Sequence, residues 1–68
     1  MTTIGEKIRA ARVAAGMTQK QLGLAVGFSE GQAESRIQKW EYGTMQPSLQ
    51  YLRPLANALK VSLDYLVP

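Results

Sequence analysis

The stretch Ser29–Gly43, SEGQAESRIQKWEYG, places Ala33, Ile37 and Trp40 at positions i, i+4 and i+7. Residues at that spacing share one side of an α-helix. The opposite side collects hydrogen-bonding side chains: Gln32, Ser35, Lys39 and Tyr42, with Arg36 and Gln38 at its edges. The pattern predicts a helix that ends at about Tyr42, before Gly43, with an apolar inner face and a polar outer face.

Capping signatures and apolar spacing predict helices on both sides of this stretch. Three segments begin with Thr or Ser and carry Glu or Gln three positions later, the capping-box pattern: Thr3-Ile4-Gly5-Glu6, Thr18-Gln19-Lys20-Gln21 and Ser29-Glu30-Gly31-Gln32. The first predicts a helix over about 4–15, and the second a short helix that Gly27 closes. Ser48 and Ser62 are expected to cap two more helices, although Pro54 conflicts with a regular helix.

The absence of period-2 alternation argues against strands, so the predicted fold is all-α, a compact bundle of about five short helices in a single domain over 1–68. The chain has no Cys, no His and a single Asp. We therefore expect no metal site, no cofactor and no enzymatic activity, and the Ser and Thr residues look like caps. No apolar run reaches membrane-spanning length, which predicts an intracellular, cytoplasmic protein without membrane contact.

Charge and the outer face together raise the question of a nucleic-acid partner. The net charge of +3 and pI of about 9.6 favour an anionic partner only weakly. Polar side chains on a protruding helix are those that read base edges in the major groove of DNA. From this pattern alone, a solvated helix surface is the favoured interpretation.

Glu41 lies at the edge of the inner face, where a bare carboxylate would be costly to desolvate. Arg12 has the same offset from the apolar residues of the first predicted helix. An Arg12–Glu41 pair would satisfy both groups and join the first helix to the third, whereas two unrelated exposed charges remain the simpler alternative.

Three segments, MTQKQLGLAVGFS, RIQKWEYG and QPSLQYLRPLANALKVSLDYL, together resemble the phage Cro/repressor type of helix-turn-helix DNA-binding domain. The resemblance covers nearly the whole chain. It includes a Thr-Gln opening of the second helix, a small residue at Gly23, a turn glycine at Gly27, and the ending Trp40-Glu41-Tyr42-Gly43. It implies a repressor-like bundle in which the second and third helices form the helix-turn-helix.

The resemblance also implies roles for individual residues. The Arg12–Glu41 pair matches a structural pair of the family, and Gln19 matches its phosphate anchor. We expect base readout by Gln32, Glu34, Ser35, Gln38 and Lys39, and phosphate contacts by Gln19, Lys20 and Arg36. The function implied is sequence-specific binding of double-stranded DNA by a transcriptional regulator, expected to be a repressor.

One small module buries limited DNA surface, so we expect a homodimer on a near-palindromic site. The C-terminal residues Tyr65, Leu66 and Val67 are candidates for the dimer contact; alternatively, they complete the core. An alternative function is a helix-turn-helix module that binds a protein, such as a toxin or a polymerase subunit.

One feature departs from the family pattern. Gly27 and Ile37 are ten positions apart, where the family usually has six. Ala33 repeats the inward position of Ile37 one turn earlier. Either the third helix is extended by one turn at its N-terminus, which would bring Gln32 and Glu30 towards the groove, or a longer turn precedes a normal helix.

Overall fold

The computed structural model describes residues 3–67, and within that range it contains five helices and no strand. The helices are α1 (Ile4–Ala14), α2 (Gln19–Val26), α3 (Ala33–Tyr42), α4 (Leu49–Leu59) and α5 (Leu63–Leu66). The prediction of an all-α bundle of five short helices is confirmed. None of the helices in the described range is both long and apolar enough to cross a membrane.

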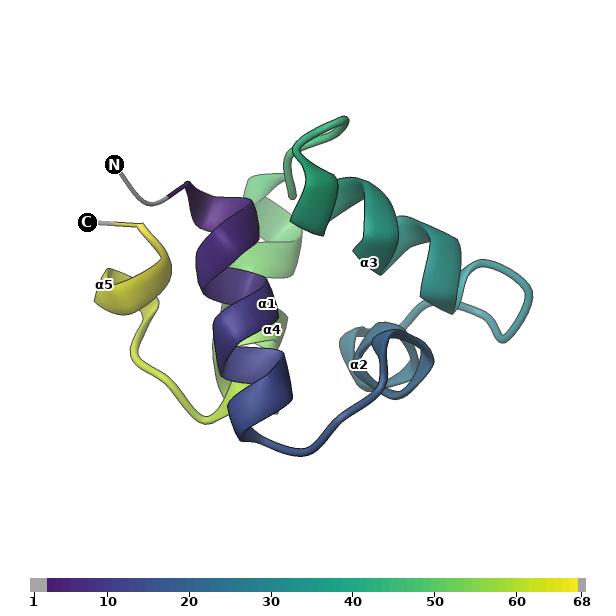
Figure 1. Cartoon of the computed structure of the whole chain (residues 1–68), viewed down its shortest axis with the longest axis horizontal. Helices are drawn as coiled ribbons and strands as arrows, with labels where there is room; N and C mark the ends of the chain where they lie inside the picture. The colour runs from purple at the N-terminus through teal and green to yellow at the C-terminus, as the bar shows by residue number, and fades with distance from the viewer. Residues whose placement is uncertain (1–2, 68) are drawn as a thin grey trace.

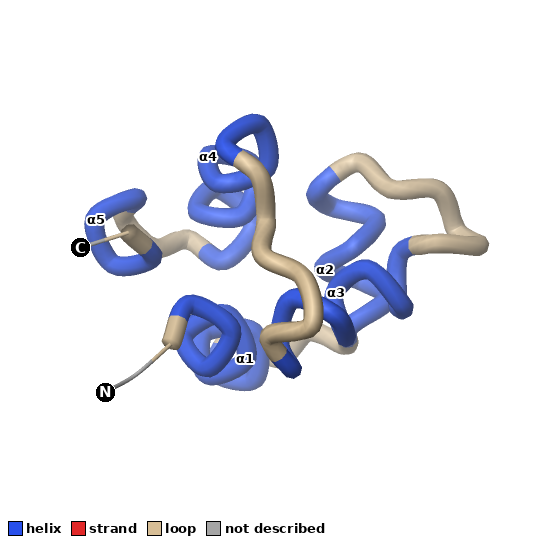
Figure 2. Tube along the Cα trace, turned by 90° about the horizontal axis from the view of Figure 1, so that it is seen from above, coloured by secondary structure: helices blue, strands red, loops and turns tan. Residues whose placement is uncertain are grey.

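The helices surround one core. In Figure 1, α4 lies behind α1, α5 lies to one side of this pair, and α2 and α3 lie to the other. Figure 2, seen from above, shows the same separation of α5 from α2 and α3. The buried core takes side chains from every helix: Ile8, Leu22, Val26, Ile37, Trp40, Leu55, Ala56, Leu59 and Leu66.

The local capping signals act as the sequence indicates for α1 and α2. The Thr3 hydroxyl accepts the Glu6 N–H at 3.2 Å, and the Thr18 hydroxyl accepts the Gln21 N–H at 3.0 Å. In both boxes the side chain of the third helical residue accepts a hydrogen bond from the backbone N–H of the N-cap residue. Gly27 ends α2 with φ 112°, in the left-handed region that glycine adopts without a steric penalty.

The start of α3 corrects two expectations. Residues 30–32 form a turn, and α3 begins at Ala33, so the one-turn extension is wrong and the longer turn is right. The Ser29 carbonyl accepts the N–H groups of Gln32 and Ala33 at 3.0 and 2.9 Å. The N-cap is Gln32 and not Ser29, so the third capping box does not form. Gly31 is a weak helix former, which favours the turn.

Helix α4 runs through Pro54 over its whole length, with Leu52, Leu55, Ala56 and Leu59 buried. Proline has no N–H, so the Gln50 carbonyl one turn earlier loses its helical partner. Gln50 is exposed, and solvent can satisfy that carbonyl. Ser48 occupies the N-cap position, but its side chain accepts no capping bond from the first turn of α4.

The C-terminal helix corrects one proposed dimer residue. Leu66 is 1% exposed and belongs to the core, so it is not available to a second copy. The side chain faces α1 and α4 because α5 packs against both. Tyr65 and Val67 are 40% and 45% exposed. Ser62 caps this helix, as its hydroxyl accepts the Tyr65 N–H at 3.2 Å.

Candidate nucleic-acid interface

Two glycines let the backbones of α1 and α2 approach α3 closely. A methyl group on Gly5 would lie 2.5 Å from the carbonyl oxygen of Trp40, and one on Gly23 would lie 2.6 Å from the Cα of Ala33. Either distance is far inside van der Waals contact. The C-terminal end of α3 therefore rests on α1 and its N-terminal end rests on α2, main chain against main chain.

These contacts place the apolar face of α3 inward. Ala33 and Ile37 are 0% exposed and Trp40 is 3% exposed. The Trp40 ring packs against Phe28 and Tyr51, with each centroid 5.4 Å away. The inner face is thus fixed both by helix contacts and by an aromatic cluster, here defined as Phe28, Trp40 and Tyr51.

The opposite side of α3 faces solvent. Ser35 and Lys39 are exposed on it, Glu34 is exposed and Gln38 half-buried at its edge, and Gln32 is exposed at the N-cap. The structure therefore gathers all five residues that the sequence nominates for base readout along about the first two turns of one helix. The Ser35 hydroxyl donates to the Gln32 carbonyl at 3.2 Å, which leaves its oxygen lone pairs free to accept.

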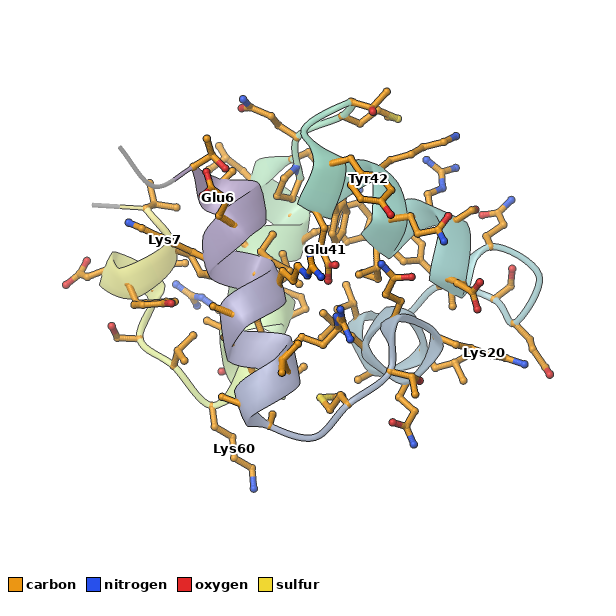
Figure 3. All side chains as sticks on the ribbon, in the orientation of Figure 1. Glu6, Lys7, Lys20, Glu41, Tyr42 and Lys60 are labelled. Carbon is orange, nitrogen blue, oxygen red and sulfur yellow. The ribbon has the colours of Figure 1, made fainter. Side chains whose placement is uncertain are left out.

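Arg12 and Glu41 form the pair expected between α1 and α3. Arg12 Nε donates to Glu41 Oε2 at 2.6 Å and Nη2 donates to Oε1 at 3.2 Å, while Nη1 donates to the Met17 carbonyl at 2.9 Å. The side chains are 13% and 2% exposed. In Figure 3 the Glu41 carboxylate lies between α1 and α3. A two-point pair of this kind fixes the angle between the two helices.

Two of the three proposed phosphate contacts are already bonded to carboxylates. Gln19 Nε2 donates to Glu41 Oε1 at 3.2 Å, which leaves one amide hydrogen free. Lys20 Nζ lies 2.9 Å from Glu30 Oε1, on the side of α2 that faces the turn (Figure 3). The hydrogen bond and charge of Lys20 hold the pKa of Glu30 below its usual value, so this carboxylate stays charged to a lower pH.

The third proposed phosphate contact, Arg36, has a different neighbour. Its guanidinium carbon lies 5.6 Å from the centre of the Phe28 ring. The ion pairs in the described part of the chain are Arg12–Glu41 and Lys20–Glu30, so neither involves Arg36. Sequence reasoning did not single out Phe28, and it named Glu30 only as a residue that an extended third helix would bring towards the groove. An aromatic residue directly after the turn glycine was the available signal for Phe28.

The exposed side of α3 suits recognition of an extended polymer. Among residues 3–67, no three His, Cys, Asp or Glu side chains are grouped to hold a metal ion. The rim of α3 and the start of α2 instead present amide, hydroxyl, ammonium and guanidinium groups. A single helix presented in this way has the dimensions to enter the major groove of B-form DNA.

Comparisons with known proteins agree with this geometry. A search of curated protein sequences gives no match. Among solved structures, the chain is similar to the P22 c2 repressor protein, crystallised in complex with the synthetic operator 9T. The two are 36% identical over 97% of this chain and 94% of that one, with a TM-score of 0.84. A model of the helix-turn-helix family matches residues 8–66. The chain belongs to this helix-turn-helix family.

Proposed function

We propose that this protein is a transcriptional regulator, acting as a repressor, that binds double-stranded DNA at a specific sequence. The observation that carries the proposal is the solvent-facing polar side of α3, held by main-chain contacts at both ends, in a fold shared with a repressor crystallised on its operator. Because the proposed ligand is the DNA of a chromosome or of a phage genome, the proposed place of action is the cytoplasm.

In the proposed complex α3 enters the major groove. Lys39 can donate to the acceptor atoms of guanine, and Gln38 can bond to the paired donor and acceptor of adenine. Ser35 can bond to either base. Glu34 can accept from the amino group of cytosine. Gln32, the N-cap residue of α3, is the remaining candidate for base readout. Gln19, Lys20 and Arg36 contact phosphates beside the groove and set the register of the helix.

We further propose that two copies bind one near-palindromic site, because a single module of this size covers little DNA. The exposed Tyr65 and Val67 at the C-terminal end remain the dimer candidates after the exclusion of Leu66. Sedimentation of the purified chain tests this part separately. A purified chain that is still monomeric at high micromolar concentration would contradict dimerisation through this end.

The decisive experiment is selection from a random duplex library, followed by a salt titration on the selected duplex. Lys20 and Arg36 are the cationic phosphate contacts, two per protomer and four per dimer, so a plot of the logarithm of the affinity against the logarithm of the salt concentration should have a slope of about −4. Failure to enrich any sequence would overturn the proposal.

Lys39→Ala tests base readout directly. It should weaken binding to the selected duplex by about 1–3 kcal/mol and binding to random duplex by much less. An equal loss on both duplexes would reassign Lys39 to a phosphate contact.

A second candidate function is binding of a protein partner through the same face. It is favoured by the Lys20–Glu30 pair, which neutralises a cation beside α3. The salt titration separates the two functions. Duplex binding weakens steeply as salt is added, because counterions released from the phosphates must be replaced, whereas binding of a protein partner through this face releases no condensed counterions and should weaken much less steeply.

A further inference from the structure

The three proposed phosphate contacts differ in what holds them before any ligand arrives. Gln19 already donates to Glu41 and Lys20 to Glu30, so each would meet a phosphate with a carboxylate bonded to the same nitrogen. Arg36 lies on an aromatic ring instead, and neither ion pair of the described residues includes it. Its charge is therefore not offset by a bonded carboxylate.

The ring beneath Arg36 is itself held firmly. The Phe28 N–H donates to the Gly23 carbonyl at 3.0 Å, which fixes the backbone of the turn. The ring centroid lies 5.4 Å from that of Trp40 and 4.9 Å from that of Tyr51, both in tilted arrangements. Packing against a Trp that is 3% exposed couples Phe28 to the core.

Arg36 stands four positions before Trp40 on α3, between the buried side and the outer side. An arginine free in solvent loses rotamer freedom when it binds a phosphate. A guanidinium resting on a ring has already lost part of that freedom, while the N–H groups at its edge stay available. The stack thus leaves Arg36 charged, half-buried and oriented.

We propose that Phe28 is a positioning residue for DNA binding, which holds the Arg36 guanidinium in the orientation that meets a phosphate beside the groove. This inference rests on the proposed function and adds to it a residue that touches no DNA itself. Of the three proposed phosphate contacts, Arg36 is therefore the one whose charge and donors are not shared with a bonded carboxylate.

The test is a double-mutant cycle on the selected duplex, with binding followed by fluorescence anisotropy. An exposed cation–π contact corresponds to roughly a two- to fivefold change in affinity. Phe28→Leu should therefore weaken binding about two- to fivefold in the wild-type background and leave binding unchanged in the Arg36→Ala background. Equal weakening in both backgrounds would overturn the proposal, because Phe28 would then act only through the fold.

Two further variants keep the test decisive. Tyr51→Leu removes another ring of the aromatic cluster, but not the one under Arg36. It should lower the urea midpoint and leave the Kd of the folded protein unchanged. Phe28→Tyr keeps a ring beneath Arg36 and should therefore bind the duplex within about twofold of wild type. A folded Phe28→Tyr protein that binds the duplex as weakly as the Arg36→Ala protein would overturn the proposal.

The outcomes also separate the two levels of inference. If the wild-type chain binds no duplex, the proposed function fails. If it binds and the changes at Phe28 and Arg36 are additive, the proposed function stands and only the positioning role fails.

Discussion

Breaking the Arg12–Glu41 pair should cost a large part of the stability of this small domain. The Glu41 side chain is 2% exposed and accepts three hydrogen bonds, two of them from Arg12 and the third from Gln19. Arg12→Met keeps most of the side-chain packing but leaves the carboxylate with the single bond from Gln19. Removing one partner of a buried pair typically costs about 3–5 kcal/mol.

The structure places this change near the lower end of that range. The Arg12 side chain is 13% exposed, so water can reach part of the space it vacates. A loss of about 3 kcal/mol compares with a total of roughly 3–10 kcal/mol for a domain of this length. With a urea dependence of about 1 kcal/mol per molar, the midpoint should fall by about 3 M.

Urea unfolding, followed by the fluorescence of Trp40, provides the assay. Glu41→Leu alone should also destabilise, because it strands the Arg12 guanidinium. The double variant Arg12→Met/Glu41→Leu should return to within about 1 kcal/mol of wild type, since no buried charge is then left unpaired. Lys20→Met breaks the exposed ion pair and is the matched control, with little change in midpoint. A fall of less than about 0.5 M for Arg12→Met, or additive losses in the double variant, would refute the reasoning.

Three other changes test separate features. Gly23→Ala should lower the free energy of unfolding by about 2 kcal/mol or more, because the added methyl meets the backbone of Ala33. Gly31→Ala should leave that free energy unchanged or raise it by up to about 1 kcal/mol, because the added carbon has open space and φ is not left-handed. Calorimetry of both variants compares the two effects. Lys60→Gly should gain up to about 1 kcal/mol, because Lys60 ends α4 with φ 57°, and Lys60→Ala should not. Glu30→Gln frees Lys20 and should tighten duplex binding roughly two- to fivefold at low salt, with no such gain when Lys20 is already Gln.

Much of the fold could be predicted from local signals. The Thr3 and Thr18 capping boxes and the glycine at position 27 depend on residues close in sequence, so they read correctly. The Arg12–Glu41 pair spans 29 positions, yet its partners could be matched because each charge lies at the edge of an apolar stripe. A charge in that place needs a partner of opposite sign.

Other features depend on tertiary contacts that no local pattern encodes. Ser29 and Gln32 have the spacing of a capping box, but α3 begins at Ala33, four residues after Ser29. This first helical residue is the one whose backbone lies against Gly23 of α2. Leu66 is as apolar as its exposed neighbours, and only the packing of α5 buries it. The stack of Arg36 on Phe28 also joins residues whose individual types reveal nothing about their partner.

The two glycines under α3 bear on how such a protein acquires a new target. Since Gly5 and Gly23 meet main-chain atoms, the axis of α3 is set independently of the side chains that point away from the bundle. Residues 34, 35, 38 and 39 can consequently be exchanged as a set while the scaffold beneath them keeps its shape. Evolution or protein engineering can therefore change the DNA sequence that α3 would recognise without changing the packing of the helices that hold α3 in place.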